Sequence, residues 1–292
     1  MHCWLASLML LLVACASAQP AAQPAAQPAA QQPAPTRAIA TLFPTRVGVP
    51  AAPAAPPAAA QPADTGWLPG GPGVELRRLR VPGPNGRPDF PIVVVRLDPA
   101  QVRLRVAYAP EQPRALRTWF NETQPTLAIN GGFFTEDYRS TALVISDGAA
   151  SGSSYEGFGG MLAVAPDGGV ALRALRDQPY DPGEPLAQAM QSWPMLVFPG
   201  GEPAPLEDDG KRARRSAIAL DRAGRVLLIA SATSEFTLRG LAEWLAGSDL
   251  DVDRALNLDG GSSTGLFLSS GGLSEQIDSF GPLPLVLLAE PK

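Results

Sequence analysis

A long segment rich in proline, alanine and glutamine confines the foldable part of this chain to the residues after it. Gln19-Pro20-Ala21-Ala22 recurs from Gln23 and from Gln27, and a second proline and alanine stretch covers residues 50–63. Such a composition buries too little apolar surface to offset the entropy lost on ordering, and its prolines favour extended polyproline II. We therefore predict a disordered tether over residues 19–66 and one globular domain over residues 67–292. The tether either lifts the domain away from a membrane or is a plain spacer.

Residues 1–18 have the pattern of an export signal. An apolar run over residues 5–13 leads into small residues, and it is too short to remain across a bilayer. Leu12-Val13-Ala14-Cys15 matches a bacterial lipobox, whereas Ala16-Ser17-Ala18 fits ordinary cleavage to a soluble product. We prefer the lipobox, because a cysteine at this place is hard to explain as signal filler. The expected product is exported to the periplasm or outer envelope, with a lipid on Cys15 as its only membrane anchor.

Cleavage at either place removes side chains on which many hydrolases depend. It removes His2, the one histidine of the sequence, together with Cys3. Cys15, the other cysteine, survives only if it is lipidated. The mature chain then has no disulfide and no histidine or cysteine zinc site. A net charge of -5 argues against a nucleic-acid partner, whose phosphates need a basic surface. Carboxylates, arginines and glycine-rich backbone remain. They require no cofactor, although a divalent cation held by carboxylates is compatible with them.

Short apolar runs bounded by glycine, proline and aspartate predict strands throughout the domain. These runs lie at residues 92–95, 127–129, 161–164, 218–220, 226–229 and 285–288. In residues 102–106, Val102, Leu104 and Val106 alternate with Arg103 and Arg105, the period-two pattern of a half-buried strand. Fewer segments predict helices: one is capped by Thr237 and ended by Gly247, one is opened by Pro113 and one by Pro185. Many strands with few, unevenly placed helices favour the α+β class, here a single domain with a mixed, mainly antiparallel β-sheet and a few helices.

Three segments carry polar and glycine residues where a strand should simply turn. They are Asn130-Gly131-Gly132-Phe133-Phe134, Arg215-Ser216-Ala217-Ile218 and Asn257-Leu258-Asp259-Gly260-Gly261-Ser262-Ser263-Thr264. If the chain is extended before the last glycines, alternation buries Leu256 and Leu258 and directs Asn257 and Asp259 to the other face. The glycines after Asp259 let backbone N–H groups approach an anion. The alternative for this segment alone is an Asp-Gly hairpin turn.

The third segment also imitates the nucleophile elbow of serine hydrolases. Residues 261–265 fit the pattern G-x-S-x-G, which normally needs a histidine as the base. The mature chain has none, and Lys211 and Lys292 are its two lysines. A serine hydrolase built on Ser263 is therefore disfavoured.

In order and spacing, the three segments resemble the phosphodiester glycosidase family, which includes the lysosomal uncovering enzyme and many exported bacterial proteins. The resemblance extends over residues 75–290, about the whole predicted domain. Ser216 stands where threonine is commoner in the family, and the glycine run after Asp259 is one residue shorter. Both departures bear on substrate preference.

The resemblance implies hydrolysis of the glycosyl C–O bond of a sugar-1-phosphodiester in the cell envelope. Such a bond breaks through an oxocarbenium-like state with an acidic phosphate leaving group. Asp259 is the candidate nucleophile or general base, and Arg215 the candidate phosphate ligand through a bidentate fork. The alternative for Arg215 is a surface salt bridge, and Arg212 and Arg214 are expected to be solvated. Asn130 is expected to orient the acid or to bind sugar hydroxyls.

The remaining predicted site residues contact substrate. They are Gly131, Gly132, Glu136, Asn257, Gly260, Gly261, Ser262, Ser263 and Thr264. Glu136, Asp137 and Glu156 are alternatives for a second carboxylate, and Phe133 and Phe134 either stack on a sugar or form a buried pair. A different class of protein stays open. A non-catalytic envelope module that binds a glycan or a phosphate-bearing polymer needs similar arginines and amides.

Overall fold

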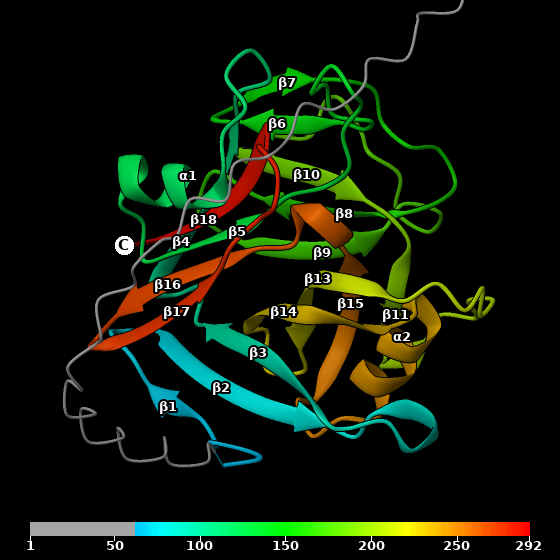
Figure 1. Ribbon diagram of the computed structural model, residues 1–292. Helices are drawn as coiled ribbons and strands as arrows, with labels where there is room; N and C mark the ends of the chain where they lie inside the picture. Colours follow the sequence, from blue (N-terminus) through cyan, green and yellow to red (C-terminus); the bar gives the residue numbers. More distant parts are fainter. Residues whose placement is uncertain (1–61) are drawn as a thin grey trace, which may run out of the picture. The chain divides into compact units, whose positions relative to one another are not determined.

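The computed structural model describes residues 62–292, which form a β-rich unit (Figure 1). The predicted signal, Cys15 and nearly all of the predicted tether lie outside the described residues. The described strands form three sheets whose neighbouring strands all run antiparallel. The prediction of a single α+β domain with mainly antiparallel strands and a few helices is thus confirmed in outline. Within the described residues no two neighbouring strands run parallel, so the sheets are not of the predicted mixed type, and helices form a small part of the domain.

The largest sheet carries two of the three sequence segments. In spatial order its eight strands are β1 (Leu68–Pro69), β2 (Val74–Val81), β3 (Phe90–Leu97), β14 (Val226–Phe236), β13 (Ala213–Asp221), β15 (Val252–Asn257), β11 (Met195–Phe198) and β12 (Glu202–Pro203). β13 contains Arg215 and Ser216, and its neighbour β15 ends at Asn257. Because Ala217 pairs with Asn257, segments distant in sequence lie side by side.

The other two sheets have five strands each. One contains β7 (Ala149–Ser151), β6 (Val144–Ser146), β10 (Gln188–Ser192), β8 (Gly160–Val164) and β9 (Val170–Ala174) in spatial order. The other contains β17 (Leu273–Ile277), β16 (Leu266–Ser270), β5 (Leu127–Asn130), β18 (Leu285–Pro291) and β4 (Val102–Tyr108). β5 brings the first segment to the centre of its sheet, because Asn130 is its last residue.

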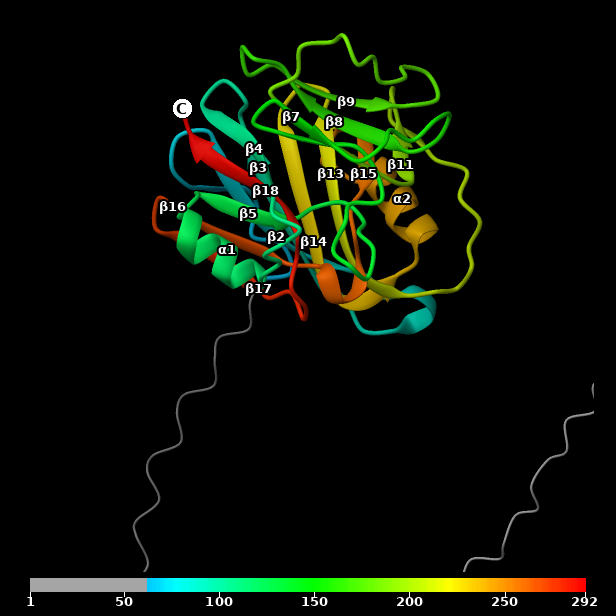
Figure 2. The same ribbon diagram turned by 90° about the horizontal axis from the view of Figure 1, so that it is seen from above.

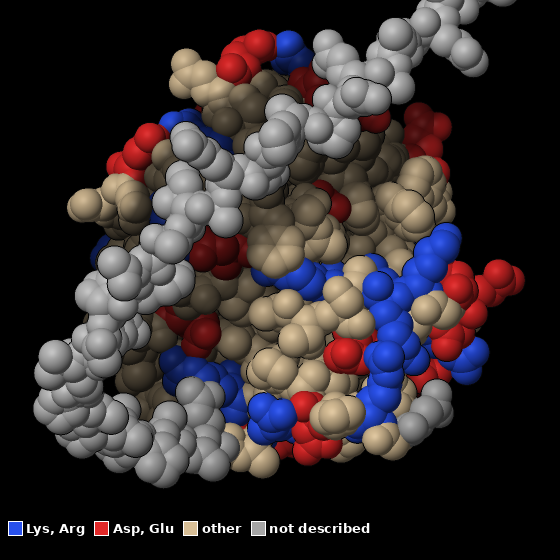
Figure 3. Space-filling model, in the orientation of Figure 1, with Lys and Arg blue, Asp and Glu red and all other residues tan. Residues whose placement is uncertain are grey.

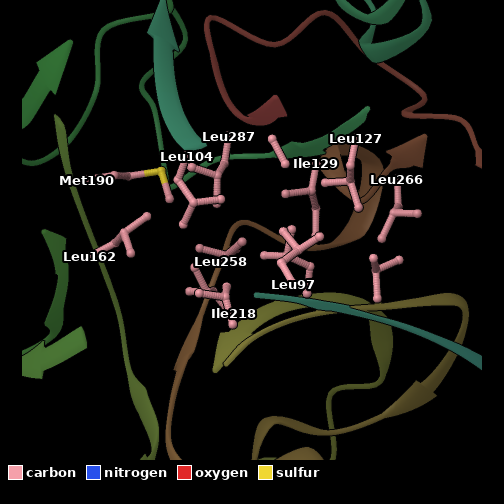
Figure 4. Packing of buried hydrophobic residues seen from close by; sticks show 14 of the residues in the cluster. Leu97, Leu104, Leu127, Ile129, Leu162, Met190, Ile218, Leu258, Leu266 and Leu287 are labelled. Carbon is pink, nitrogen blue, oxygen red and sulfur yellow. The ribbon is translucent and has the colours of Figure 1, made fainter. Parts of the chain in front are cut away.

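Side chains from all three sheets meet in one hydrophobic core (Figure 4). Its members include Leu97, Leu104, Leu127, Ile129, Leu162, Met190, Ile218, Leu256, Leu258, Leu266 and Leu287. Such a continuous cluster is the core of one domain. Leu256 and Leu258 have no exposed surface, so the burial predicted for these two leucines is confirmed. Burial of these leucines fixes the chain on either side of Asn257.

Two α-helices cover the sheets of the described residues from opposite sides (Figure 2). They are α1 (Leu116–Thr123) and α2 (Leu238–Gly247), and the short 3-10 turns are η1 (Pro84–Gly86) and η2 (Gly261–Ser263). The Thr237 hydroxyl accepts the N–H of Gly240 at 3.0 Å, as the predicted cap requires. Both helices were predicted from the sequence. Neither is long and apolar enough to cross a membrane.

The helix predicted at Pro185 is wrong. Only a short link follows Pro185 before β10 begins at Gln188. All five residues of this strand are buried, including Gln188 and Gln191. Gln188 accepts a hydrogen bond from the N–H of Val106 at 3.1 Å. Partners of this kind let glutamines occupy a buried strand, where the sequence suggested a helix.

The domain begins before the boundary predicted at Trp67. The N–H of Arg80 donates to the carbonyl of Ala63 at 2.7 Å, so the chain pairs with β2 from residue 63. Asp64 forms an ion pair with Arg77 at 2.6 Å, and Asp249 pairs with the same guanidinium at 2.8 Å. The carboxylates hold the pKa of Arg77 above its ordinary value although its side chain is buried. Residues 63–66 are therefore part of the domain.

This boundary predicts different outcomes for two truncations. A chain beginning at Pro62 should unfold at the same urea midpoint as the full-length protein. A chain beginning at Trp67 should lose about 1–3 kcal/mol of unfolding free energy, because Arg77 stays buried without one of its two carboxylates. Asp64→Asn in the full-length chain should reproduce much of that loss. Equal midpoints for the two truncated chains would contradict the boundary.

Candidate active site

The side chain of Asn130 joins the three sequence segments. Its Oδ1 accepts hydrogen bonds from the Ser216 hydroxyl at 2.7 Å and from the N–H of Gly265 at 3.1 Å. Its Nδ2 donates to the carbonyl of Asp259 at 2.7 Å and to that of Gly131 at 3.3 Å. Asn130 has no exposed surface. The end of β5, the middle of β13 and the turn after β15 are thus held together by one amide.

This arrangement favours one of the two roles expected of Asn130, that of orienting the acid. A side-chain amide has two N–H donors and one oxygen with two acceptor positions, and the protein occupies all four. Asn130 therefore has no hydrogen-bonding group left for a sugar hydroxyl. It positions the backbone of Asp259.

Asn130→Ala should accordingly be strongly destabilising. It leaves the Ser216 hydroxyl, the N–H of Gly265 and the carbonyl of Asp259 buried without this partner. Each such group costs about 1–3 kcal/mol, so we expect a loss of about 3–5 kcal/mol in urea unfolding. Ser216→Ala removes a single hydrogen bond and should cost about 1 kcal/mol. An Asn130→Ala protein within about 0.5 kcal/mol of the wild type would refute this role.

Asp259 presents a partly buried carboxylate at the start of the glycine turn. Its N–H donates to the carbonyl of Gly131 at 3.0 Å, and its Oδ1 accepts the N–H of Gly260 at 2.9 Å. Among the described residues no arginine or lysine forms an ion pair with it. Burial raises the pKa of Asp259, against smaller lowering effects of the Ser263 hydroxyl and the Gly260 N–H. A desolvated, unpaired carboxylate of this kind is a functional-site candidate.

The raised pKa predicts how Asp259 affects stability with pH. The folded state binds this proton more tightly than the unfolded chain, whose aspartate titrates at about 3.9. Its contribution is therefore most favourable below that pH and is lost as the pH rises through the folded-state value. Asp259→Asn should raise the melting temperature at pH 7, and the gain should shrink toward pH 4. A lower melting temperature at pH 7 would contradict the assignment of an uncompensated buried charge.

Arg215 is fixed beside the same turn. Its Nε donates to the carbonyl of Phe236 at 3.2 Å and its Nη2 to that of Lys211 at 2.9 Å. Its Nη1 lies 3.8 Å from the position that a Cβ on Gly260 would occupy. Two of the five guanidinium N–H groups are used, which leaves both on Nη1 and one on Nη2 for a ligand. Arg215 itself forms no salt bridge within the described residues, and burial lowers its pKa against the field of Asp209.

Arg214 is not solvated, contrary to expectation. It is 6% exposed, and its Nη2 donates to the carbonyl of Asp278 at 2.8 Å. The Phe280 ring covers the guanidinium, with its centroid 4.0 Å from Cζ. Nε and Nη1 are buried and have no partner among the described residues, and burial lowers the pKa of Arg214. Strand alternation could have found it, because Arg214 shares a face of β13 with Ser216. Basic side chains gather over this part of the molecule (Figure 3).

Several predicted substrate contacts instead pack inside the protein. Asn257 is 1% exposed and donates from Nδ2 to the carbonyl of Trp193 at 2.9 Å, and Thr264 has no exposed surface. A Cβ on Gly131 would lie 2.5 Å from Leu285 Cγ, and one on Gly132 would lie 2.6 Å from the carbonyl oxygen of Gln191. These glycines are required by close packing between sheets. Asn257 and Thr264 are buried, and Asn257 Oδ1 and Thr264 Oγ1 have no hydrogen-bond partner among the described residues.

The rest of the turn lies nearer the surface. Gly261 adopts a φ of 62° at the start of η2, a left-handed conformation that favours glycine. Ser262 is exposed, and its carbonyl accepts the N–H of Phe280 at 2.7 Å. Ser263 is buried beside the Asp259 carboxylate. Gly260 packs against the carbonyl oxygen of Arg214, 2.9 Å from its Cβ position.

In the described residues, none of the three candidates for a second carboxylate is hydrogen-bonded to Asp259. These candidates, Glu136, Asp137 and Glu156, are all exposed. No group of three acidic, histidine or cysteine side chains suited to a metal occurs in residues 62–292. Hollows of about 470 and 460 Å³ lie beside α1 and α2, and neither is lined by Asp259.

Phe133 and Phe134 do not form a buried pair. The Phe133 ring lies 5.8 Å from that of Trp193, whereas Phe134 stacks on Tyr138 at 5.9 Å. Phe134 also packs against the cluster under α1. The two rings therefore have different neighbours, Trp193 for Phe133 and Tyr138 for Phe134.

The sequence model of the phosphodiester glycosidase family matches residues 123–283. This match includes all three segments, and the chain belongs to that family. Among curated proteins, none matches the chain.

Solved structures with the same fold come from distant proteins. One is the catalytic domain of zebrafish N-acetylglucosamine-1-phosphodiester alpha-N-acetylglucosaminidase, auto-inhibited by its pro-peptide. It is 18% identical to this chain with a TM-score of 0.61, and the match covers 76% of this chain and 84% of the zebrafish chain. A hypothetical protein from Synechocystis is 18% identical with a TM-score of 0.52, and the match covers 75% of this chain and 62% of that one. A Burkholderia pseudomallei protein described as exported is 12% identical with a TM-score of 0.52, and the match covers 72% of this chain and 76% of that one. At these identities the likeness concerns the fold.

Proposed function

We propose that this chain hydrolyses the glycosyl C–O bond of a sugar-1-phosphodiester in the cell envelope. One observation carries the proposal. A desolvated carboxylate, Asp259, is followed directly by Gly260, beside which Arg215 holds unused N–H groups. A carboxylate and a guanidinium that both adjoin Gly260 fit an anomeric carbon and its phosphate. Family membership supports this class of reaction.

In the proposed reaction the bond between the anomeric carbon and the phosphate oxygen breaks. Its electron pair goes to the phosphate, and Arg215 stabilises the added negative charge. Asp259 acts at the positive anomeric carbon in one of two ways. Its carboxylate either bonds to that carbon until water displaces it, or it takes a proton from the water that attacks. Both require an ionised Asp259, so kcat/KM should fall as the pH drops through its raised pKa.

Arg214 adds a second positive charge on the inner face of β13. Its guanidinium has no carboxylate within ion-pair distance among the described residues, and two of its nitrogens are unused. In the proposed site it strengthens the field that favours an anion near Gly260. The Ser263 hydroxyl helps to keep Asp259 ionised, because it lowers the pKa of that carboxyl.

The cellular location rests on the sequence and on one structural relative. The pattern of residues 1–18 favours export, and the related Burkholderia pseudomallei protein is described as exported. Attachment through Cys15 stays a prediction, since that residue lies outside the described part.

Turnover separates the enzyme from a binding module. The wild-type protein should convert the methyl diester of N-acetylglucosamine-1-phosphate to N-acetylglucosamine and methyl phosphate, and EDTA should not stop it. Binding of this diester without release of the sugar would instead establish the non-catalytic module. Labelling of Ser263 by a fluorophosphonate would contradict both.

A further inference from the structure

Large apolar side chains are exposed at few places on the described domain, and all are aromatic. They are Phe158, Trp193 and Phe280, which are 51%, 46% and 75% exposed. Exposed apolar groups that cluster mark binding surfaces, whereas isolated ones need no explanation. Whether these three residues cluster, and where they lie relative to Asp259, therefore decides whether they form a binding surface.

Trp193 and Phe158 belong to one cluster with two half-buried rings. Phe133 lies 5.8 Å from Trp193, and Tyr155 stacks on Phe158 at 4.6 Å between ring centres. A Cβ on Gly159 would be 3.1 Å from Tyr155 and 3.5 Å from Trp193, so the two pairs adjoin across this glycine. We call Phe133, Tyr155, Phe158 and Trp193 the aromatic rim.

The buried side chain of Gln191 holds the rim in shape. Its Oε1 accepts the N–H of Tyr155 at 2.8 Å, and its Nε2 donates to the Ser154 hydroxyl at 2.8 Å. Gln191 is 1% exposed and lies two residues before Trp193. The loop with Tyr155 and the segment with Trp193 are thus fixed to each other before any ligand binds, which lowers the entropy cost of binding.

The sheet order places the rim on a definite side of Asp259. In the largest sheet β15 lies between β13 and β11. Arg215 is on β13, Asp259 follows β15, and Trp193 precedes β11. Asn257 also ties β15 to Trp193, whose carbonyl accepts its Nδ2 at 2.9 Å. The carboxylate therefore lies between the phosphate-binding arginine and the rim.

We infer that the aromatic rim binds the sugar to be released and a second sugar joined to it, so that the substrate class is an oligosaccharide-1-phosphodiester. This inference rests on the proposed function. With the phosphate at Arg215 and the anomeric carbon at Asp259, the sugar extends toward Trp193 and Phe133. The pair of Tyr155 and Phe158 lies beyond, where a second ring of the same glycan falls.

The chemistry of the rim favours sugar over lipid. Its exposed surface consists of flat rings, and no leucine, isoleucine, valine or methionine is exposed as a large hydrophobic group in the described residues. The Tyr155 hydroxyl is 2.7 Å from the hydroxyl of exposed Thr141, so hydrogen-bonding groups border the rings. A pyranose presents apolar C–H faces with hydroxyls at its edge, and amphipathic aromatic sites match that pattern. An acyl chain would need an aliphatic groove.

Substrate length tests the inference. The wild type should hydrolyse the methyl diester of chitobiose-1-phosphate with a kcat/KM at least about tenfold above that of the N-acetylglucosamine diester, the effect of an anchor that contributes about 1.4 kcal/mol. Phe158→Ala should bring this ratio close to one through a higher KM for the longer substrate. Phe280→Ala, an exposed aromatic outside the rim, should keep the ratio. Equal rates for the two substrates in the wild type would overturn the inference.

Binding keeps this test separate from the proposed chemistry. If neither diester is hydrolysed, the proposed function fails, and calorimetric titration with the 1-phosphates of chitobiose, maltose and mannobiose still decides about the rim. At least one should bind, and Phe158→Ala and Trp193→Ala should each weaken it about tenfold or more, with Trp193→Phe partly restoring affinity. Absence of binding by all three overturns the inference. So does attachment to phosphatidylglycerol vesicles that Phe158→Ala abolishes.

Discussion

Asp259→Asn should lower kcat on a sugar-1-phosphodiester by at least about 10³-fold while KM changes little. The substitution keeps the shape of the side chain and an acceptor for the Gly260 N–H, which lies 2.9 Å from Oδ1 in the wild type. It removes the charge that acts at the anomeric carbon. Because burial raises the pKa of this carboxyl, the same variant should gain stability at pH 7. Lost activity with retained or higher stability is the pattern of a catalytic group.

Two controls separate this effect from general damage. Asp251→Asn changes an exposed aspartate just before the same strand, and it should keep activity within about threefold of the wild type. Ser263→Ala should cost less than about tenfold and should move the acidic limb of the pH profile upward, since the hydroxyl lowers the pKa of Asp259. Residual kcat above about one tenth in Asp259→Asn would rule out its proposed role.

Arg215→Lys should lower kcat/KM by about 10²- to 10³-fold, as loss of one preorganised donor does. A lysine keeps the charge but cannot hold the carbonyls of Phe236 and Lys211 while presenting two N–H groups to a phosphate. Arg212→Lys is the matched control, and it should change kcat/KM less than about threefold. Comparable losses in both variants would show that the region needs only a diffuse positive charge.

The fold could be predicted where the residues of a single strand or helix are enough to identify that element. The period-two run at residues 102–106 and the cap at Thr237 each specify their element locally, and both are confirmed. β10 was missed because its glutamines are satisfied by partners distant in sequence, such as Val106. The start of the domain was missed for a related reason. Asp64 joins it through Arg77, which no local pattern reveals.

The candidate site could likewise be predicted only in part. Asp259 and Arg215 follow from the glycine-rich and arginine-containing segments, and the structure places them beside Gly260. The sequence left the role of Asn130 open between orienting the acid and binding a sugar, because its partners Ser216 and Gly265 come from other parts of the chain. Arg214 was taken for a solvated neighbour of Arg215. Its burial results from Phe280, which the loop before β18 brings over it.

The position of bond cleavage tests the central claim most directly. The methyl diester of N-acetylglucosamine-1-phosphate should be hydrolysed by the wild type in water enriched in ¹⁸O, and the methyl phosphate examined by mass spectrometry and ³¹P NMR. Attack at the anomeric carbon breaks the C–O bond, so methyl phosphate should contain no ¹⁸O from the solvent. One ¹⁸O atom in methyl phosphate would show attack at phosphorus and would contradict a glycosidase mechanism based on Asp259.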